Sequence, residues 1–169
     1  MTTPIRLNLG CGDGMALEDF INVDAYPYKG VDVVAQLPDG LLQWEAGGVA
    51  EMYAGHFLEH LPPWETERFL DICELILAPG GSLTIVVPDA DKARLLMESH
   101  VMSPPQYALC VAGARHDAMP HWTLWNTARL EQALERAGFA VDPSYRWQDD
   151  ARVYDRNAPW QCGVRGVKR

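Results

Sequence analysis

The sequence predicts an α/β protein with an open, doubly wound sheet of seven mostly parallel strands. Short β-prone runs alternate with helical segments along most of the 169 residues, which is typical of parallel sheets built from βαβ units. In addition, residues 82–87 (SLTIVV) form a nearly continuous apolar run, as expected of a strand that is covered on both faces. We expect a single domain over residues 1–169, long enough to bury a core.

The strands are predicted from β-prone runs that end at glycine, proline or polar residues. Their ranges are 5–9, 20–23, 31–34, 49–54, 82–87, 139–141 and 161–167. Only residues 14–19 separate the glycine loop after the first strand from the second strand. A parallel crossover usually needs a dozen or more residues, so the first crossover helix is expected to be very short, about one turn.

The clearest helix is predicted over residues 64–77, and Pro79-Gly80-Gly81 is its stop signal. Its apolar residues repeat with the spacing of one buried helical face: Phe69, Ile72, Cys73 and Ile76. A last helix follows Asn126, a plausible N-cap, and stops at Gly138. The less regular stretch 90–125 is predicted to hold two short helices.

Composition and charge restrict the class of protein. The chain is 48% hydrophobic and 22% charged, as in ordinary globular proteins. A net charge of −9 disfavours a nucleic-acid partner, because phosphate binding depends on clustered Lys and Arg. No apolar run approaches the ~20 residues of a membrane span, the N-terminus has no signal-peptide pattern, and the four cysteines are far apart. We therefore expect a cytoplasmic protein with free thiols and no membrane partner.

Polar or glycine residues follow five of the predicted strands. They are Gly10-Cys11-Gly12, Asp24, Gln36, His56 and Asp89. In open α/β sheets, ligands bind beyond the carboxyl ends of the strands, where the strand order reverses. These residues therefore predict one ligand site at that edge of the sheet.

The glycine loop favours a nucleoside cofactor. Glycines allow the backbone to approach a ligand closely, and Asp24 can accept two hydrogen bonds from ribose hydroxyls. The dinucleotide fingerprint G-x-G-x-x-G is incomplete because residue 15 is Met, and a phosphate-binding P-loop sequence is absent. A ligand without pyrophosphate, such as S-adenosylmethionine, fits this loop better; a nicotinamide cofactor stays open as an alternative.

Five stretches together resemble class I S-adenosylmethionine-dependent methyltransferases: LNLGCGDG, INVD, FLEHL, LAPGGSLTIVVPD and LEQALERAGF. The likeness is greatest to a compact bacterial and phage group of predicted methyltransferases. It implies a seven-stranded Rossmann-like sheet, S-adenosylmethionine as the cofactor, and methyl transfer to a small-molecule or glycan acceptor, with a hydroxyl as the expected atom type. A non-catalytic protein that binds the same cofactor stays open as an alternative, and the oligomeric state stays undefined.

The resemblance also implies which residues contact the cofactor. They are Gly10, Cys11, Gly12, Asp24, Ala25, Gln36, Leu37, Gly55 and His56. Asp24 would hold the ribose and Ala25 would lie against the adenine. Gln36 stands where many relatives carry an acidic residue, and Asn8 replaces another acidic residue before the glycine loop.

The stretch His56-Phe57-Leu58-Glu59-His60 also matches H-x-x-E-H, an inverted zinc-protease pattern. Such a protease needs a long helix and a third ligand. Here Pro62-Pro63 would end any helix within about one turn, and the sequence offers no evident third ligand. We therefore expect no metal, and we interpret the stretch as the segment after the fourth strand.

Methyl transfer to a hydroxyl is helped by a general base, and three residues are candidates. His56 and Asp89 follow predicted strands, and His121 lies in the aromatic-rich part of residues 90–125, the stretch expected to form a lid on the acceptor side. Each candidate has a structural alternative: His56 could only shape the cofactor pocket, Asp89 could cap a helix that starts near Ala90, and His121 could be a surface or core residue.

Overall fold

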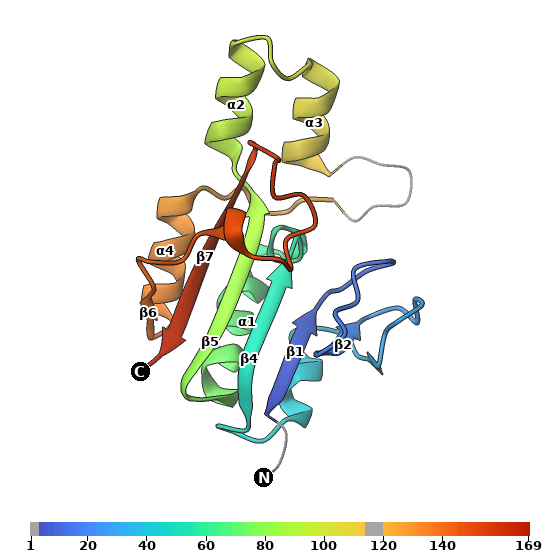
Figure 1. Ribbon diagram of the computed structural model, residues 1–169, viewed down its shortest axis with the longest axis vertical. Helices are drawn as coiled ribbons and strands as arrows, with labels where there is room; N and C mark the ends of the chain where they lie inside the picture. Colours follow the sequence, from blue (N-terminus) through green and yellow to red (C-terminus); the bar gives the residue numbers. More distant parts are fainter. Residues whose placement is uncertain (1–3, 114–119) are drawn as a thin grey trace.

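The computed structural model describes residues 4–113 and 120–169, and it contains a seven-stranded sheet with the order β3-β2-β1-β4-β5-β7-β6 (Figure 1). The strands are β1 (Ile5–Leu9), β2 (Ile21–Asp24), β3 (Val33–Val34), β4 (Val49–Gly55), β5 (Leu77–Pro88), β6 (Phe139–Val141) and β7 (Gln161–Lys168). The first five strands pair in parallel, and β7 is antiparallel to both β5 and β6. The predicted mostly parallel α/β sheet is confirmed.

The strand order reverses between β1 and β4, so the crevice between their carboxyl ends is the position where such sheets bind ligands. Side chains alternate along each strand, which gives the sheet two faces of different composition. In β5, Leu83, Ile85 and Val87 join the main apolar cluster, whereas Val86 belongs to a smaller cluster on the opposite face.

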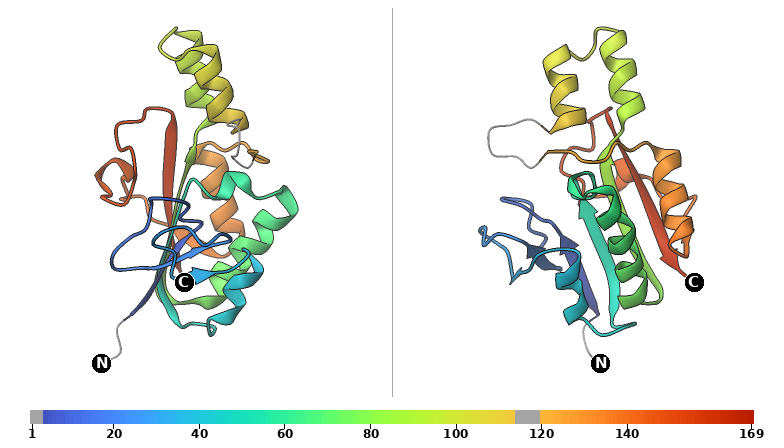
Figure 2. Two further views of the ribbon diagram at one scale, coloured as in Figure 1. Left: turned by 90° about the vertical axis from the view of Figure 1, so that its right-hand side faces the viewer. Right: turned by 180° about the vertical axis from the view of Figure 1, so that it is seen from behind.

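Within residues 4–113 and 120–169, α-helices cover only one of these faces. Figure 2 shows α1 (Pro63–Ile76), α4 (Thr127–Arg136) and the short 3-10 helix η1 (Asp39–Gln43) on the same side of the sheet. The predicted buried face of α1 is confirmed, since its four repeating apolar residues are at most 7% exposed. At α4, the Asn126 side chain accepts a hydrogen bond from the Arg129 amide at 2.8 Å, which confirms the predicted N-cap.

Two further helices stand beyond the carboxyl edge of the sheet. They are α2 (Ala90–Glu98) and α3 (Pro104–Ala112), and they pack on each other through Ala93, Met102 and Cys110 (Figure 1). They confirm the two short helices predicted within residues 90–125. None of the described helices has the length and apolar character required to cross a bilayer.

The other face of the sheet is covered by loops, residues 10–20 and 142–160, the second of which includes the 3-10 turn η3 (Trp147–Asp149) (Figure 2). The expected one-turn crossover helix after β1 is not formed: residues 10–20 hold turns instead. Asn22 supplies the reason, because its side chain accepts from the Leu17 amide and donates to the Leu17 carbonyl. Side-chain hydrogen bonds thus satisfy backbone groups that a helix would have paired.

Candidate functional site

The glycine turn after β1 lies directly against the end of β2. The Gly10 amide donates to the Val23 carbonyl at 2.8 Å. Gly10 has a φ of +64°, and a Cβ at this position would collide with the ring of Phe57. Only glycine fits this turn, because the backbone is left-handed and the aromatic ring fills the space beside it.

Asp24 is held at this turn by two backbone amides. Gly12 donates to Asp24 Oδ2 at 2.8 Å, and Tyr26 donates to Asp24 Oδ1 at 3.0 Å. The residue is 8% exposed, so its carboxylate is nearly buried but still reaches the surface. A carboxylate offers about four acceptor sites, so two stay available for a ligand.

The other predicted cofactor residues differ in their exposure to solvent. Gly55 ends β4 and is buried, Ala25 is half-buried, Leu37 is buried and Gln36 is exposed. The Cys11 thiol is buried, and burial together with the nearby Asp24 carboxylate raises its pKa to about 11. Its side chain is therefore a neutral packing group.

Two aromatic side chains that the sequence did not single out stand beside Asp24. Tyr26 and Tyr28 are 53% and 42% exposed, and their ring centroids lie 5.8 Å apart. Exposed aromatic rings beside a carboxylate are suited to stacking on the base of a nucleoside ligand. The sequence signal for them was only their position directly after INVD.

A cavity of about 570 Å³ lies between the carboxyl ends of β4 and β5 and the helices α2 and α3. Its lining comprises His56, Glu59, His60, Pro88, Leu96, Val101, Met102, Gln106, Leu109, Cys110, His121, Pro159 and Trp160. Two of the three predicted catalytic residues, His56 and His121, are therefore brought together on one wall although 65 positions separate them in the chain (121 − 56).

His56 contacts an oxygen with each ring nitrogen. Nε2 lies 2.9 Å from Gln161 Oε1, and Nδ1 lies 3.3 Å from Glu59 Oε1. Burial by itself would lower the pKa of His56, but the Glu59 carboxylate and Gln161 raise it above the ordinary histidine value. This arrangement favours the doubly protonated ring. Gln161 comes from β7, and nothing in the sequence pointed to this contact.

Glu59 is the most unusual group of this wall. It is 2% exposed, and neither carboxylate oxygen accepts a hydrogen bond from any described residue. The 3.3 Å contact from His56 is within ion-pair range but lacks hydrogen-bond geometry. Buried carboxylates normally have partners, so Glu59 calls for a physical explanation.

His121 packs edge-on against His60, with ring centroids 4.8 Å apart and an interplanar angle of 77°. Burial lowers the pKa of His121, and the neighbouring His60 acts in the same direction, against the opposing charge of Glu59. The neutral ring is the favoured form.

Asp89, the third predicted catalytic residue, caps α2. Its Oδ1 accepts from the amides of Asp91 at 3.1 Å and Lys92 at 3.0 Å. It is 3% exposed and is not among the described residues that line the cavity. These contacts support the alternative role of Asp89 as the N-cap of α2. A role of Asp89 as a general base stays a prediction.

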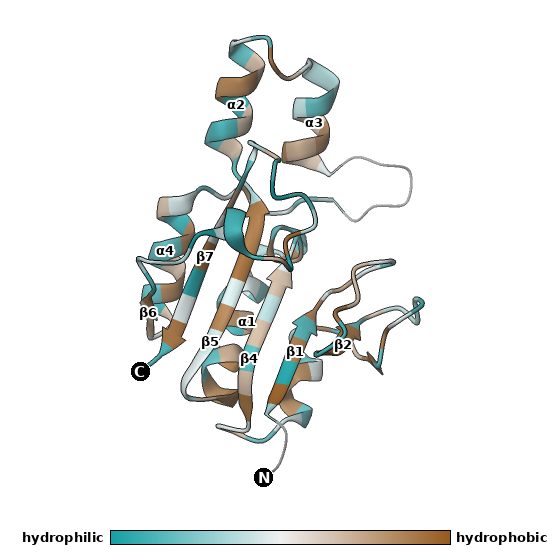
Figure 3. Ribbon diagram, viewed as in Figure 1, coloured by the Kyte–Doolittle hydropathy of each residue, from teal (hydrophilic) through white to brown (hydrophobic). Residues whose placement is uncertain are grey.

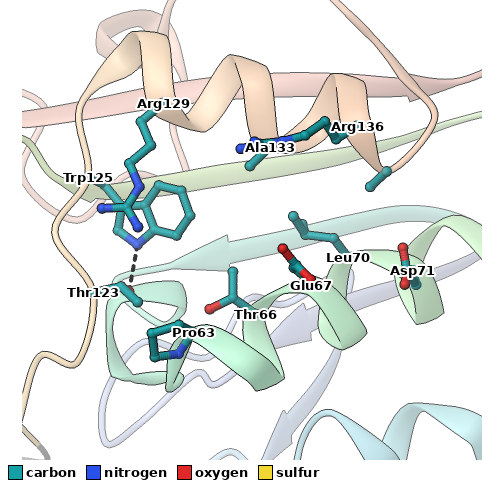
Figure 4. A pocket seen from close by; sticks show the side chains of 11 residues that line it. Pro63, Thr66, Glu67, Leu70, Asp71, Thr123, Trp125, Arg129, Ala133 and Arg136 are labelled. Atoms are coloured by element: carbon teal, nitrogen blue, oxygen red, sulfur yellow. Dashed lines mark hydrogen bonds between the residues drawn. The ribbon is translucent and has the colours of Figure 1, made fainter.

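A second cavity, of about 370 Å³, lies between α1 and α4 on the helix-covered face (Figure 4). Its walls include Thr66 and Glu67 of α1 and Arg129 of α4, and the Trp125 indole donates to Thr123 Oγ1 at 2.9 Å. None of the predicted site residues lines this cavity. We therefore place the candidate site at the carboxyl edge of the sheet.

Comparison with solved structures shows what this fold is similar to. A SAM-dependent methyltransferase from Archaeoglobus fulgidus aligns with a TM-score of 0.63 and 17% identity, over 98% of this chain and 86% of that chain. The 1,6-didemethyltoxoflavin-N1-methyltransferase of Burkholderia thailandensis, solved with 1,6-didemethyltoxoflavin and S-adenosylhomocysteine, aligns with a TM-score of 0.62 and 15% identity, over 98% and 71% of the two chains. These likenesses confirm the predicted fold.

No curated protein matches the sequence significantly. The profile of a family described as a methyltransferase domain, by contrast, matches residues 5–144. This range includes the glycine turn, Asp24 and the three histidines that line the cavity (His56, His60 and His121, the histidine wall). That match covers most of the chain and confirms the predicted family. The protein belongs to the methyltransferase-domain family.

Proposed function

We propose that the protein transfers a methyl group from S-adenosylmethionine to a small-molecule or glycan acceptor, with a hydroxyl as the accepting group. The observation that carries this proposal is the seating of the Asp24 carboxylate on the Gly12 amide at 2.8 Å, at the carboxyl end of β2. The carboxylate keeps two acceptor sites and stands beside a glycine turn with no pyrophosphate fingerprint, and this combination suits the ribose of an adenosyl sulfonium cofactor.

The cofactor and the acceptor would occupy neighbouring spaces. Gly55 ends β4 and His56 follows it. The next residue, Phe57, lies against Gly10 of the glycine turn, while His56 itself lines the 570 Å³ cavity. A cavity of this size holds a small molecule or one or two sugar rings. The lid of α2 and α3 would cover this side and keep water from the methyl group.

The reaction is an in-line displacement. The acceptor oxygen forms a bond to the methyl carbon while the carbon–sulfur bond breaks, and the electron pair of that bond stays on sulfur to give S-adenosylhomocysteine. The hydroxyl proton leaves the acceptor. Much of the acceleration comes from alignment of the two reactants, since the sulfonium is already electrophilic.

Among the predicted bases, two line the cavity. His56 faces Gln161 and Glu59 oxygens with its two nitrogens and is therefore better placed to hold protons than to accept one. His121 is the candidate to accept the hydroxyl proton in a metal-free site.

Calorimetry with S-adenosylmethionine, S-adenosylhomocysteine and NAD tests the cofactor. We expect the first two to bind and NAD not to bind. Asp24→Asn should weaken S-adenosylmethionine ~10- to 100-fold, because charge-assisted hydrogen bonds to the ribose are lost. Asp19→Asn is the matched control, since Asp19 is exposed and precedes β2 at its amino end; it should leave the affinity unchanged. Equal affinities of the two variants would reject the assignment of Asp24.

Transfer itself is tested by release of S-adenosylhomocysteine with a panel of hydroxyl, amine and carboxylate acceptors. Turnover with hydroxyl compounds supports the proposal. Tight cofactor binding with no turnover on any acceptor would instead favour the non-catalytic alternative. The separate cavity beside the cofactor region argues for transfer, because a protein that only binds the cofactor has no need of it.

A further inference from the structure

We infer that Glu59, His60 and His121 form a binding site for a divalent transition-metal ion on the wall of the acceptor cavity. One carboxylate oxygen and one nitrogen of each ring all lie within 4.8 Å of one another. The three residues come from two segments, η2 (Leu58–His60) and the stretch before α4, so the site exists only in the folded chain. No metal was expected from the sequence, because Pro62-Pro63 would end any helix within about one turn and no third ligand was evident. The third ligand, His121, lies 61 positions after His60 (121 − 60).

Glu59 is the observation that points to a ligand. Its carboxylate is 98% buried beside two imidazoles, with no hydrogen bond to either oxygen among the described residues. An ionised carboxylate in such a place is costly unless it is paired or coordinates a metal. The His56 ring, 3.3 Å away, offsets part of this charge without forming a hydrogen bond. A cation shared with His60 and His121 would supply the bonded partner that the carboxylate lacks.

The backbone holds the two segments together independently of the side chains. The Glu59 carbonyl accepts from the amides of Trp122 at 2.8 Å and Thr123 at 3.2 Å. His60 Nδ1 lies 3.4 Å from the Pro120 carbonyl, a contact that favours the tautomer with a free lone pair on Nε2. Metal-binding histidines commonly donate their other ring N–H to a carbonyl in this way.

The donor set defines the class of ion. Two imidazoles and one carboxylate, with positions left open, are typical of catalytic zinc sites and of other first-row transition ions, whereas Mg²⁺ and Ca²⁺ prefer oxygen ligands. Donors on a tetrahedral ion with bonds of about 2.1 Å lie roughly 3.4 Å apart. The three side chains would therefore need to draw together by no more than about 1.4 Å.

The site would act on the acceptor, and this role rests on the proposed methyl transfer. All three ligands line the 570 Å³ cavity, so the open positions of the ion face the space assigned to the acceptor. A hydroxyl bound to the ion loses its proton more readily, which makes the oxygen a better nucleophile. His121 then serves as a ligand rather than as a base, and the acceptor proton passes to water in the cavity.

Metal binding is tested first without cofactor or acceptor. The chelator-treated full-length protein is titrated with Zn²⁺ in competition with a chromophoric chelator, and separately with Co²⁺ and Mg²⁺. We expect one Zn²⁺ per chain, visible absorption bands of Co²⁺ in a site of four or five ligands, and much weaker binding of Mg²⁺. A Co²⁺ spectrum identical to that of the hydrated ion in the wild-type protein would overturn the inference without any variant.

Variants then identify the ligands. Glu59→Gln and His121→Ala should each weaken Zn²⁺ binding at least ~100-fold, because a three-ligand site loses one donor. His100→Asn is the matched control: it removes an exposed histidine outside the group and keeps a residue that tolerates its φ of +59°. Its Zn²⁺ affinity should equal that of the wild type. Affinity retained in both ligand variants, or lost equally in the control, would contradict the site.

The two proposals fail separately. Loss of S-adenosylmethionine binding leaves the Zn²⁺ result unaffected, because that titration contains no cofactor. Conversely, turnover that is unchanged by chelation and by added Zn²⁺, Mn²⁺ or Co²⁺ would leave methyl transfer intact while removing the proposed role of the ion.

Discussion

The two faces of the central sheet are built from the same strands but are covered in different ways. Along β4, Met52 and Ala54 belong to the apolar cluster under the helices, whereas Glu51 and Tyr53 lie on the face that the loops cover. Because side chains alternate along a strand, each strand contributes to both environments.

Apolar burial dominates the helix-covered face. The cluster there includes Leu7 and Leu9 of β1, Leu83 and Ile85 of β5, and Phe69 of α1, all 0% exposed. Each helix supplies a continuous apolar stripe, so no charged side chain is needed between the layers.

The loop-covered face combines a smaller apolar cluster, which includes Val86 and Trp147, with charged groups. Arg152 donates at 2.6 Å to both Glu51 and Asp150, and its guanidinium lies 4.9 Å from the centre of the Tyr53 ring. Arg165 lies 4.6 Å from the centre of the Tyr145 ring. In Figure 3 the loop of residues 142–160 is mostly hydrophilic, and it lies in front of the carboxyl half of β5, which is mostly hydrophobic.

The difference shows how a short chain can keep the sheet of this family without helices on both faces. A loop has no periodic apolar stripe, so it is fixed by ion pairs and aromatic contacts to polar residues of the strands. The site at the carboxyl edge includes residues from both coverings of the sheet. The glycine turn belongs to the loop of residues 10–20, and η2 leads into α1 on the helix-covered face.

The largest effect is expected on the helix-covered face. Phe69→Ala should lower the free energy of unfolding by about 3–5 kcal/mol, because a fully buried ring is replaced by a cavity. Leu75→Ala in the same helix is the control, since Leu75 is 49% exposed, and it should change stability by about 0.5 kcal/mol or less. Urea unfolding measures both; equal losses would mean that this face does not carry the core.

A smaller but distinct effect is expected on the loop-covered face. Arg152→Met keeps most of the stem but removes the charge shared by Glu51 and Asp150, and should cost about 2–4 kcal/mol because two partly buried carboxylates lose their partner. Arg94→Met breaks the exposed pair with Glu98 and should leave the stability nearly unchanged, because solvent screens this pair. If the two substitutions lower the free energy of unfolding by the same amount, the Arg152 network contributes no more than an ordinary surface ion pair.

Much of this organisation could be predicted from the sequence. The stripe of α1, the Asn126 cap and the strand ends followed local patterns of period and capping, and the structure reproduces them. The proximity of Asp24 to the glycine turn followed from parallel pairing of two consecutive strands.

The remaining features depend on contacts between distant segments. The expected first crossover helix is absent because Asn22, in the next strand, pairs with the backbone at Leu17. The loop-covered face depends on Arg152, which no local pattern distinguishes from the other arginines. The histidine wall needs the stretch after residue 119 to return to η2 through the Trp122 and Thr123 amides. The spacing of residues in the sequence does not predict which distant segments come into contact.

The smallest effect concerns the pH dependence of the loop-covered face. Burial would raise the pKa of Asp150, but the hydrogen bonds and charge of Arg152 lower it below the ordinary value of 3.8. The unfolded chain therefore binds this proton more readily than the folded chain, so the carboxylate stabilises the fold above about pH 4 and loses that contribution as the pH falls through its lowered pKa.

The unfolding free energy of the wild type should accordingly fall more steeply between about pH 5 and pH 3 than that of Asp150→Asn. Urea titrations at closely spaced pH values measure the two slopes, and the other carboxylates, common to both proteins, cancel in the difference. In the Arg152→Met background the slopes with and without Asp150 should converge, because the group that lowers the pKa of Asp150 is gone. Parallel curves for the wild type and Asp150→Asn, both with Arg152 intact, would mean that the ion pair does not distinguish the loop-covered face energetically, leaving its aromatic contacts to hold the loop.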